Sequence, residues 1–238
     1  MMVLLEVAGL TKHFKGITAL DGVSFTLSAG ELLGVIGPNG AGKTTLLNVI
    51  NGYIEPDSGF VRFRGVRTDG RPPHQMAKLG IARTYQVPRV FRQMTALENV
   101  LVPLFAAGSR EYQKIKIALA ALELVGLADK AYSIAGSLSG GQQKLLELAR
   151  ALAFNPVFML LDEPFAGVHP VLTERIINII KEKNKETGLS CILVSHDIQT
   201  TLKLCDRLVA MHEGKIIADG KSEEVTKNIN VVESYLGV

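Results

Sequence analysis

The sequence predicts an α/β fold with a mainly parallel sheet, and two patterns support this prediction. Short, continuous apolar runs, typical of strands buried on both faces, occur at Leu32–Ile36, Val157–Leu161 and Cys191–Ser195. Helical patterns occur at Lys43–Gly52 and Pro170–Thr187, and strands that alternate with helices favour a parallel sheet. The chain has 238 residues, 47% of them hydrophobic, so it is long enough for one large domain or a core with a subdomain.

Strand patterns of a second kind lie nearer the N-terminus. The apolar residues of Val3–Ala8 and Val23–Leu27 alternate with polar ones, as in strands with one buried face. A third strand pattern, Phe60–Arg64, follows a turn at residues 56–59. We expect these strands to form an antiparallel β subdomain beside the main sheet.

A helical insertion is predicted over residues 86–135. Thr95 and Glu98 have the spacing of a capping box and open its first helix. With the helix that follows, it should form a helical subdomain over about residues 86–150. The two helices predicted within the insertion are Ala96–Phe105 and Glu111–Val125.

Towards the C-terminus, the sequence predicts a hairpin and two capped helices. The segments Leu208–Met211 and Lys215–Asp219 flank a Glu-Gly turn, which indicates a β-hairpin. Asp197 is placed to cap the helix after the third apolar strand, and Ser222 to cap the last helix.

Composition restricts the class of protein. A net charge of +3 does not indicate a nucleic-acid partner, and we interpret four arginines between residues 62 and 71 as a solvated edge hairpin rather than a polyanion site. No apolar run approaches the ~20 residues of a membrane span, and the short apolar start predicts no secretory signal. Cys191 and Cys205 lack metal-ligand spacing, so buried, reduced thiols in a cytosolic protein are expected.

The segment Gly37–Thr44 matches the motif G-x-x-x-x-G-K-[ST], between a predicted strand and a predicted helix. Its glycines allow backbone N–H groups to surround phosphate oxygens at a helix N-terminus, whose dipole favours anions. Lys43 would reach the β- and γ-phosphates, and Thr44 would bind Mg²⁺. We therefore predict a P-loop NTPase core, because the alternative of a non-binding turn does not explain the flanking strand and helix. The expected nucleotide contacts are Asn39, Gly40, Gly42, Lys43, Thr44 and Thr45.

Two adjacent carboxylates, Asp162 and Glu163, follow the second apolar strand. A carboxylate at such a strand end can hold Mg²⁺ through water, opposite the phosphate loop. The pair divides naturally into a metal ligand, Asp162, and a base that activates water, Glu163. The alternative for Glu163 is a solvated acid in the turn before Pro164.

Ser139 and Gln142, in the segment Leu138-Ser139-Gly140-Gly141-Gln142, also have capping-box spacing, and an apolar-periodic helix follows them. The two glycines would leave backbone N–H groups free at this helix N-terminus, which makes it a second anion site. One chain with one phosphate loop has no evident use for such a site, whereas a symmetric dimer would. Taken alone, the segment could be an ordinary helix cap.

Together these motifs resemble the nucleotide-binding subunits of ABC transporters, and the resemblance covers residues 1–238 as a single ABC ATPase domain. By resemblance, Phe14 would stack on adenine, Gln86 would contact the γ-phosphate and Mg²⁺, and His196 would hold the attacking water in line with the γ-phosphate. On its own, a histidine at this strand end would more often be structural than functional.

The resemblance also implies partners. Ser139, Gly141 and Gln142 would contact the ATP of a second ABC ATPase subunit, identical or related. ATP and Mg²⁺ are the expected cofactors, and integral-membrane permease subunits and an extracytoplasmic substrate-binding protein the expected partners, with no nucleic acid. The chain would be peripheral at the cytoplasmic face of the membrane. A soluble ABC ATPase without a transport role is an alternative, but such proteins usually carry tandem cassettes or long coiled-coil insertions.

Several segments are similar to those of one subfamily. Residues 81–86, 90–100 and 232–237 are similar to the ATPases of branched-chain amino-acid importers. The segment 101–118 is shorter than is usual there, and residues 163–168 are similar to the motor of lipopolysaccharide export. Because more segments are similar to the importers, we expect an importer ATPase for branched-chain or related amino acids, with the exporter as the alternative.

His169 stands where the family usually has Asp, in a loop that in the family crosses the dimer interface. It is either a tolerated substitution or a residue that makes dimerisation or turnover sensitive to pH near ~6.5, where an unperturbed imidazole titrates.

Overall fold

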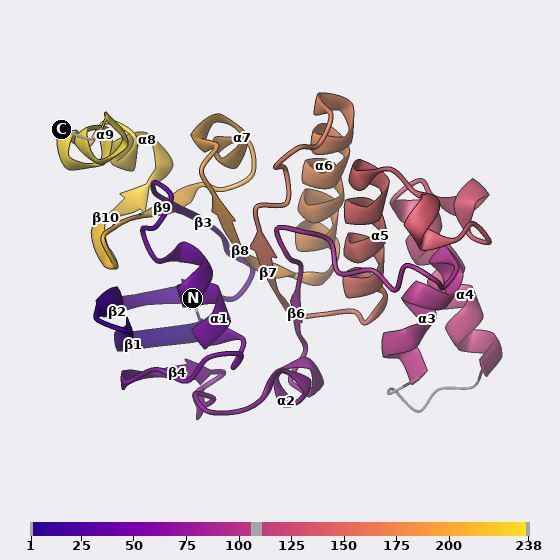
Figure 1. Ribbon diagram of the computed structural model, residues 1–238, viewed down its shortest axis with the longest axis horizontal. Coiled ribbons are helices and arrows are strands. Elements are labelled where there is room, and N and C mark those ends of the chain that lie inside the picture. The colour runs from indigo at the N-terminus through magenta and orange to yellow at the C-terminus, as the bar shows by residue number, and fades with distance from the viewer. Residues whose placement is uncertain (1, 106–110, 237–238) are drawn as a thin grey trace.

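The computed structural model describes residues 2–105 and 111–236, and its centre is a six-stranded sheet in the order β10-β9-β3-β8-β7-β6 (Figure 1). Every neighbouring pair is parallel except β9 and β10, the predicted hairpin. The mainly parallel sheet is therefore confirmed, although β6 was not predicted as a strand. The strands are β3 (Leu32–Ile36), β6 (Ile81–Arg83), β7 (Phe158–Asp162), β8 (Ser190–Ser195), β9 (Arg207–His212) and β10 (Lys215–Lys221).

A second, four-stranded sheet has the order β2-β1-β4-β5 and is antiparallel throughout, which confirms the predicted β subdomain. Its first two strands are longer than expected. Register shifts between them, for example between Val7 and Leu10, interrupt the alternation of apolar residues that marks a strand in sequence. The strands are β1 (Val3–Phe14), β2 (Ile17–Ser28), β4 (Ser58–Phe63) and β5 (Val66–Arg67).

The helices cover the central sheet and form a separate group beside it, where α3, α4 and α5 pack on one another (Figure 1). Their bounds are α1 (Lys43–Ile50), α2 (Pro73–Lys78), α3 (Ala96–Phe105), α4 (Glu111–Leu124), α5 (Gly140–Ala153), α6 (Pro170–Thr187), α7 (Ile198–Leu202), α8 (Ser222–Val225) and α9 (Ile229–Leu236). Short 3₁₀ turns occupy residues 128–130 and 135–137. Among these elements, α2 was not anticipated from the sequence.

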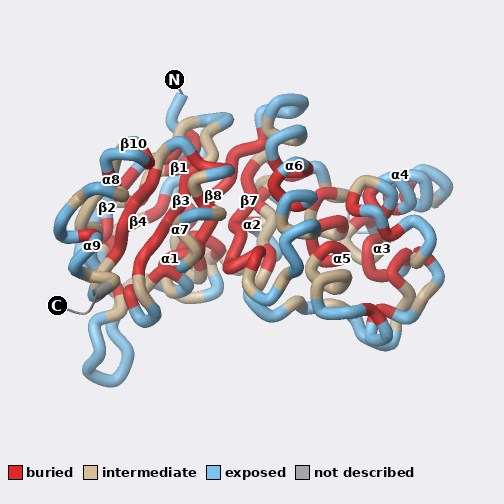
Figure 2. Tube along the Cα trace, turned by 90° about the horizontal axis from the view of Figure 1, so that it is seen from above, coloured by how far each residue is buried: buried red, intermediate tan, exposed pale blue. Residues whose placement is uncertain are grey.

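The central sheet separates two hydrophobic cores, and Figure 2 shows its strands β3, β7 and β8 buried in the interior. Along β7, Phe158 and Leu160 face the antiparallel sheet and α1, whereas Met159 and Leu161 face the helices on the other side. Both faces of the strand are therefore apolar, which is why it appears in sequence as a continuous hydrophobic run.

Local helix signals were mostly correct. The capping box of α3 forms, with the N–H of Glu98 3.1 Å from Thr95 Oγ1 and the N–H of Thr95 2.7 Å from Glu98 Oε2. Asp197 caps α7 by accepting the N–H of Thr200 at 3.1 Å. The prediction for Ser222 was wrong, because it is the first residue of α8 and its hydroxyl donates to the carbonyl of Cys205 at 2.7 Å.

Both cysteines are buried and free, as predicted. Across the ranges that the structure describes, no helix combines the length and apolar character needed to cross a bilayer. Residues 106–110 lie outside the described residues, and so does Gly237. The comparison of segments 101–118 and 232–237 with the importer subfamily is therefore a statement about sequence.

Candidate active site

The carboxyl ends of three neighbouring strands bring the predicted site residues together. In the sheet, β8 lies between β3 and β7. The strand β3 leads into the glycine loop at Gly37, β7 ends at Asp162, and β8 ends at Ser195, directly before His196. Parallel strands end at the same edge of a sheet, so the loop, the two acids and the histidine meet at one edge.

Close backbone approaches shape the glycine loop. Gly42 has φ 98°, and a Cβ there would lie 2.3 Å from the carbonyl oxygen of Ala19. At Gly37 a Cβ would lie 2.2 Å from the carbonyl oxygen of Met211. Neither position accepts a side chain without displacing backbone. Gly42 is also the N-cap of α1 and provides no side-chain cap to its first turn.

Lys43 lies inside this loop and is buried. Its ammonium donates to the carbonyl oxygens of Gly37 at 2.7 Å and Pro38 at 2.9 Å. Burial lowers the pKa of Lys43, while the nearby carboxylates of Glu163 and Asp162 raise it. The loop thus carries a positive charge beside backbone that can approach an anion closely.

Asp162, which is buried, lies next to the loop and contacts Thr44, which is exposed. The hydroxyl of Thr44 donates to Asp162 Oδ1 at 3.3 Å, and Arg83 Nη2 holds the other oxygen, Oδ2, at 3.2 Å. Both side chains of the ion pair between Arg83 and Asp162 are almost completely buried. Sequence reasoning did not single out Arg83 as a site residue, because the three-residue strand that positions it has no detectable pattern in the sequence.

Glu163 is held in a strained and crowded position. Its φ of 48° is in the left-handed region, which costs a non-glycine residue energy. One carboxylate oxygen lies 2.9 Å from His196 Nδ1, and the other accepts from the hydroxyl of Ser195 at 3.5 Å. Lys144 Nζ donates to the carbonyl oxygens of Glu163 and Ala166 at 2.8 and 2.7 Å, so α5 holds the backbone of this turn.

Most of the predicted nucleotide contacts line one cleft of about 220 Å³. Gln86 and Glu163 face the loop across it. Phe14 is 41% exposed at the end of β1, paired with Ile17 on β2, and it is Ile17 that lines the cleft. The lining residues are Ile17, Thr18, Ala19, Asn39, Gly40, Ala41, Gly42, Lys43, Thr44, Thr45, Gln86 and Glu163.

The segment around Ser139 is outside that cleft, at the N-terminus of α5. Its capping box forms, because the N–H of Gln142 donates to Ser139 Oγ at 3.3 Å and the N–H of Ser139 donates to Gln142 Oε1 at 2.9 Å. This N-terminus is therefore less bare than predicted, since its own side chains take up two donors. Among the described residues, the backbone N–H groups of Gly140 and Gly141 have no hydrogen-bond partner.

A loop that can hold phosphate on backbone N–H groups, faced by an acid pair at the adjoining strand ends, defines the class of protein as a P-loop ATPase. Residues 20–166 match the family model described as ABC transporter. The chain belongs to this family, as an ATP-binding cassette that binds nucleotide and hydrolyses ATP.

Curated relatives cover nearly the whole chain. A probable branched-chain amino acid transport ATP-binding protein LivG of Archaeoglobus fulgidus is 39% identical, over 99% of this chain and 96% of its own. The high-affinity branched-chain amino acid transport ATP-binding protein BraF of Pseudomonas aeruginosa is 36% identical, over 98% of each chain.

Solved structures agree with this family. The ADP conformation of MJ1267, an ATP-binding cassette of an ABC transporter, has a TM-score of 0.88 at 35% identity and covers 100% of both chains. The dimeric structure of a post-hydrolysis state of the cassette MJ0796, bound to ADP and Pi, has a TM-score of 0.86 at 30% identity, over 92% of this chain and 99% of that one.

Proposed function

We propose that this chain is the ATP-hydrolysing motor of an importer for branched-chain or related amino acids. The support is that LivG and BraF, which match nearly the whole chain, are both described as branched-chain amino acid transport ATP-binding proteins. The alternative of a lipopolysaccharide-type exporter rests on the sequence of residues 163–168 alone, and we do not adopt it. The single observation that supports the ATPase chemistry is the position of Glu163. It has a left-handed φ, contacts His196 and lines the cleft opposite the phosphate loop.

The donor set at the loop fits Mg²⁺. Thr44 and Asp162 offer hard oxygen donors side by side, and Gln86 lines the same cleft. In the part of the chain that the structure describes, no cluster of three or more His, Cys, Asp or Glu could hold a metal. That suits Mg²⁺, which in triphosphate sites uses one or two carboxylates together with phosphate oxygens. When bound, Mg²⁺ would offset negative charge on the phosphates.

The remaining residues divide the chemistry. Lys43 would exchange its bonds to the loop carbonyls for bonds to the β- and γ-phosphates. Glu163 would take the proton of the attacking water, and His196, in contact with Glu163, would hold that water and the γ-phosphate in line. Phe14 would stack on adenine beside the lining residue Ile17. These contacts would hold the water, the γ-phosphate and the base in line, and this alignment would lower the activation barrier for hydrolysis.

We further propose a head-to-tail dimer in which the N-terminus of α5 binds the ATP of the other subunit. The free N–H groups of Gly140 and Gly141, and the hydroxyl of Ser139, are the donors that would face the partner's γ-phosphate. The relative MJ0796 forms a dimer with nucleotide, which supports this arrangement. ATP would favour the closed dimer, because its γ-phosphate contacts both subunits only in that state.

A permease would dock on the groove between α2, β6 and the helical region of α3 and α5. This groove has a volume of about 740 Å³ and a largely apolar lining. Its charged lining residues are Lys78, Arg83, Arg89 and Arg150, with no carboxylate among the described residues that line it. Such a groove suits an amphipathic helix with acidic residues. The chain would then lie at the cytoplasmic face of the membrane, and an extracytoplasmic binding protein would deliver the solute to the permease.

The experiment that tests the catalytic proposal is Glu163→Gln. We expect ATP binding to be retained, hydrolysis to fall by ~10²–10⁴-fold, and an ATP-bound dimer to accumulate on size-exclusion chromatography. Glu182→Gln, the same change at an exposed position on α6, is the matched control. Unchanged turnover in Glu163→Gln would refute its role as the base.

The transport proposal is tested by purification from membranes of the source cell. We expect the tagged chain to bring with it an integral-membrane permease, and the complex to bind branched-chain amino acids through an extracytoplasmic protein. Recovery with ribosomes, or with a lipopolysaccharide-transport permease, would contradict the importer assignment and leave the ATPase chemistry untouched.

A further inference from the structure

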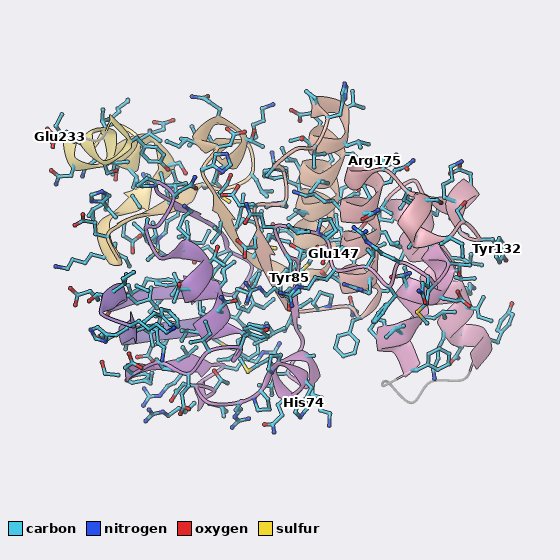
Figure 3. All side chains as sticks on the ribbon, viewed as in Figure 1. His74, Tyr85, Tyr132, Glu147, Arg175 and Glu233 are labelled. Atoms are coloured by element: carbon cyan, nitrogen blue, oxygen red, sulfur yellow. The ribbon has the colours of Figure 1, made fainter. Side chains whose placement is uncertain are left out.

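A buried carboxylate on α5 holds the loop that carries Gln86. Glu147 is only 2% exposed. It accepts the backbone N–H of Tyr85 at 3.0 Å and that of Arg89 at 2.9 Å, one on each carboxylate oxygen. Figure 3 shows Tyr85 and Glu147 beside one another where the sheet meets α5. The chain segment 85–89, the Gln86 loop, is thus closed around a single carboxylate.

The burial of this charge is costly. Burial raises the pKa of Glu147, while the N–H groups of Arg89 and Tyr85, and then the charge of Arg150, lower it. Arg150 is one turn further along α5, with its Nη2 3.6 Å from Glu147. A buried carboxylate persists where its hydrogen bonds offset desolvation, and charge-assisted bonds are the strong kind. Here both of those bonds serve the Gln86 loop and neither serves the helix that carries Glu147.

On its other side, the Gln86 loop is connected to Asp162, which together with Thr44 is a proposed Mg²⁺ ligand. The guanidinium of Arg83 lies 4.9 Å from the ring centre of Tyr85, and that of Arg89 lies 4.1 Å from the same ring. Arg83 also holds Asp162. The Gln86 loop is therefore connected to Asp162 through Arg83 and to α5 through Glu147.

The same helix has its N-cap at Ser139, eight residues before Glu147, which is ~12 Å along its axis. We propose that Glu147 is a positioning residue that fixes Gln86 to α5, so that the subunit's own ATP site and the partner's ATP site move together. The inference rests on the proposed roles of Gln86 and Ser139. It predicts that loosening Glu147 impairs Mg²⁺-dependent hydrolysis and the cooperativity between the two sites, and leaves binding of ATP to one subunit unaffected.

The test is Glu147→Gln in the full chain, with Glu182→Gln as the control for the same chemical change at an exposed position. The amide oxygen of the glutamine can still accept one backbone N–H. The amide NH₂ group cannot accept the other, so one of the two bonds to Tyr85 and Arg89 is lost. We expect kcat to fall about 10-fold, the Mg²⁺ concentration for half-maximal rate to rise about 5-fold, and the Hill coefficient for ATP to approach ~1. ATP binding without Mg²⁺ should change by less than about 2-fold.

A merely structural role for Glu147 predicts a different result. The melting temperature would fall, while kcat, the Mg²⁺ dependence and the Hill coefficient stayed at their wild-type values. That outcome would overturn the inference. If the wild type itself showed no ATPase activity, the proposed function would fail instead, so the two failures are distinguishable.

A second pair of variants tests the inference from the side of the loop, in case Glu147→Gln does not fold. Arg89→Pro removes both the guanidinium and the backbone N–H, whereas Arg89→Ala removes only the guanidinium. We expect Arg89→Pro to need about 5-fold more Mg²⁺ than Arg89→Ala for half-maximal rate. Equal Mg²⁺ dependence in the two variants would show that the N–H bond to Glu147 has no role in positioning Gln86.

Discussion

The N-termini of α1 and α5, the two helix ends at which we propose that phosphate binds, are built in opposite ways. The first turn of α1 has Gly42 as its N-cap and no side-chain cap, and it lies in the same chain's cleft. The first turn of α5 has a complete capping box, and its residues do not line that cleft. Both helices offer the same dipole to an anion, so the difference is in which donors remain available.

This difference corresponds to two ways of using a ligand. An uncapped N-terminus depends on its anion, because phosphate takes the place of the missing cap. A capped N-terminus is already ordered without a ligand, so it can remain folded until it binds the phosphate of a nucleotide held by another subunit. We therefore expect substitutions at α1 to abolish nucleotide binding and substitutions at α5 to abolish assembly.

The largest effect is expected at α1. Lys43→Ala removes the charge that the loop carbonyls now hold, and we expect ATP affinity and hydrolysis each to fall by at least ~100-fold. Fluorescent-nucleotide titration and phosphate release measure the two quantities. Lys185→Ala, at a position on the outer part of α6 away from the cleft, is the control. Near wild-type affinity in Lys43→Ala would mean that the loop backbone alone holds the phosphates.

The next effect separates the two N-termini. Ser139→Arg places a bulky side chain at the proposed dimer interface and leaves α1 unchanged. We expect nucleotide binding to the monomer within about 2-fold of wild type, but no ATP-driven dimer and a loss of hydrolysis of ~100-fold or more. The Glu163→Gln background makes the dimer visible on size-exclusion chromatography. A Ser139→Arg protein that still dimerised with ATP would show that the N-terminus of α5 does not serve the partner's nucleotide.

A milder change tests the cap by itself. Ser139→Ala removes the acceptor for the N–H of Gln142 and should cost about 1 kcal/mol of unfolding free energy, which lowers Tm by about 2–4 °C in a chain of this length. Differential scanning calorimetry of the monomer measures it. An unchanged Tm would show that the capping box contributes nothing before the partner arrives.

The smallest effect concerns His169, which caps α6 by accepting the N–H of Val171 on Nδ1 at 3.3 Å. Only the neutral ring offers this acceptor, because both nitrogens of an imidazolium are donors. The asparagine of a His169→Asn variant would cap without titrating. Because both side chains can cap α6, we expect the ATPase rates of wild type and this variant to differ by about 2-fold or less, and pH profiles of the two proteins measure the difference. Superimposable pH profiles would show that His169 is a tolerated substitution.

The sequence predicted those parts of the fold and of the site that depend on neighbours in the chain. Capping boxes at Thr95 and Ser139, the glycine loop, and the acids at the end of β7 are all local signals. Ser222 shows the limit of such signals, because its hydroxyl had a better acceptor in Cys205, distant in sequence. The strand β6, only three residues long, is stabilised by pairing with β7 and has no period of its own to detect.

The site residues that sequence reasoning missed are those whose partners lie far along the chain. Arg83 pairs with Asp162, Lys144 holds the carbonyl of Glu163, and Glu147 accepts from Tyr85. Arg83 and Glu147 are charged residues among apolar neighbours, which signals burial but does not name a partner, whereas Lys144 follows two glutamines and carries no such signal. The hydrogen-bond partner of each residue is determined by the order of the strands in the sheet, and no sequence motif indicates that order.

Glu147 also has a consequence for protein engineering. A hybrid cassette is most simply made by exchanging one continuous stretch of sequence between relatives. Here residues 85–89 and the carboxylate of α5 are separated by 58 or more positions in the chain, yet they form one contact unit. A hybrid whose junction falls at about residue 92 would take the loop from one parent and its acceptor from the other. The natural module for exchange is therefore discontinuous, and a graft of the helical region should carry residues 85–89 along with α5.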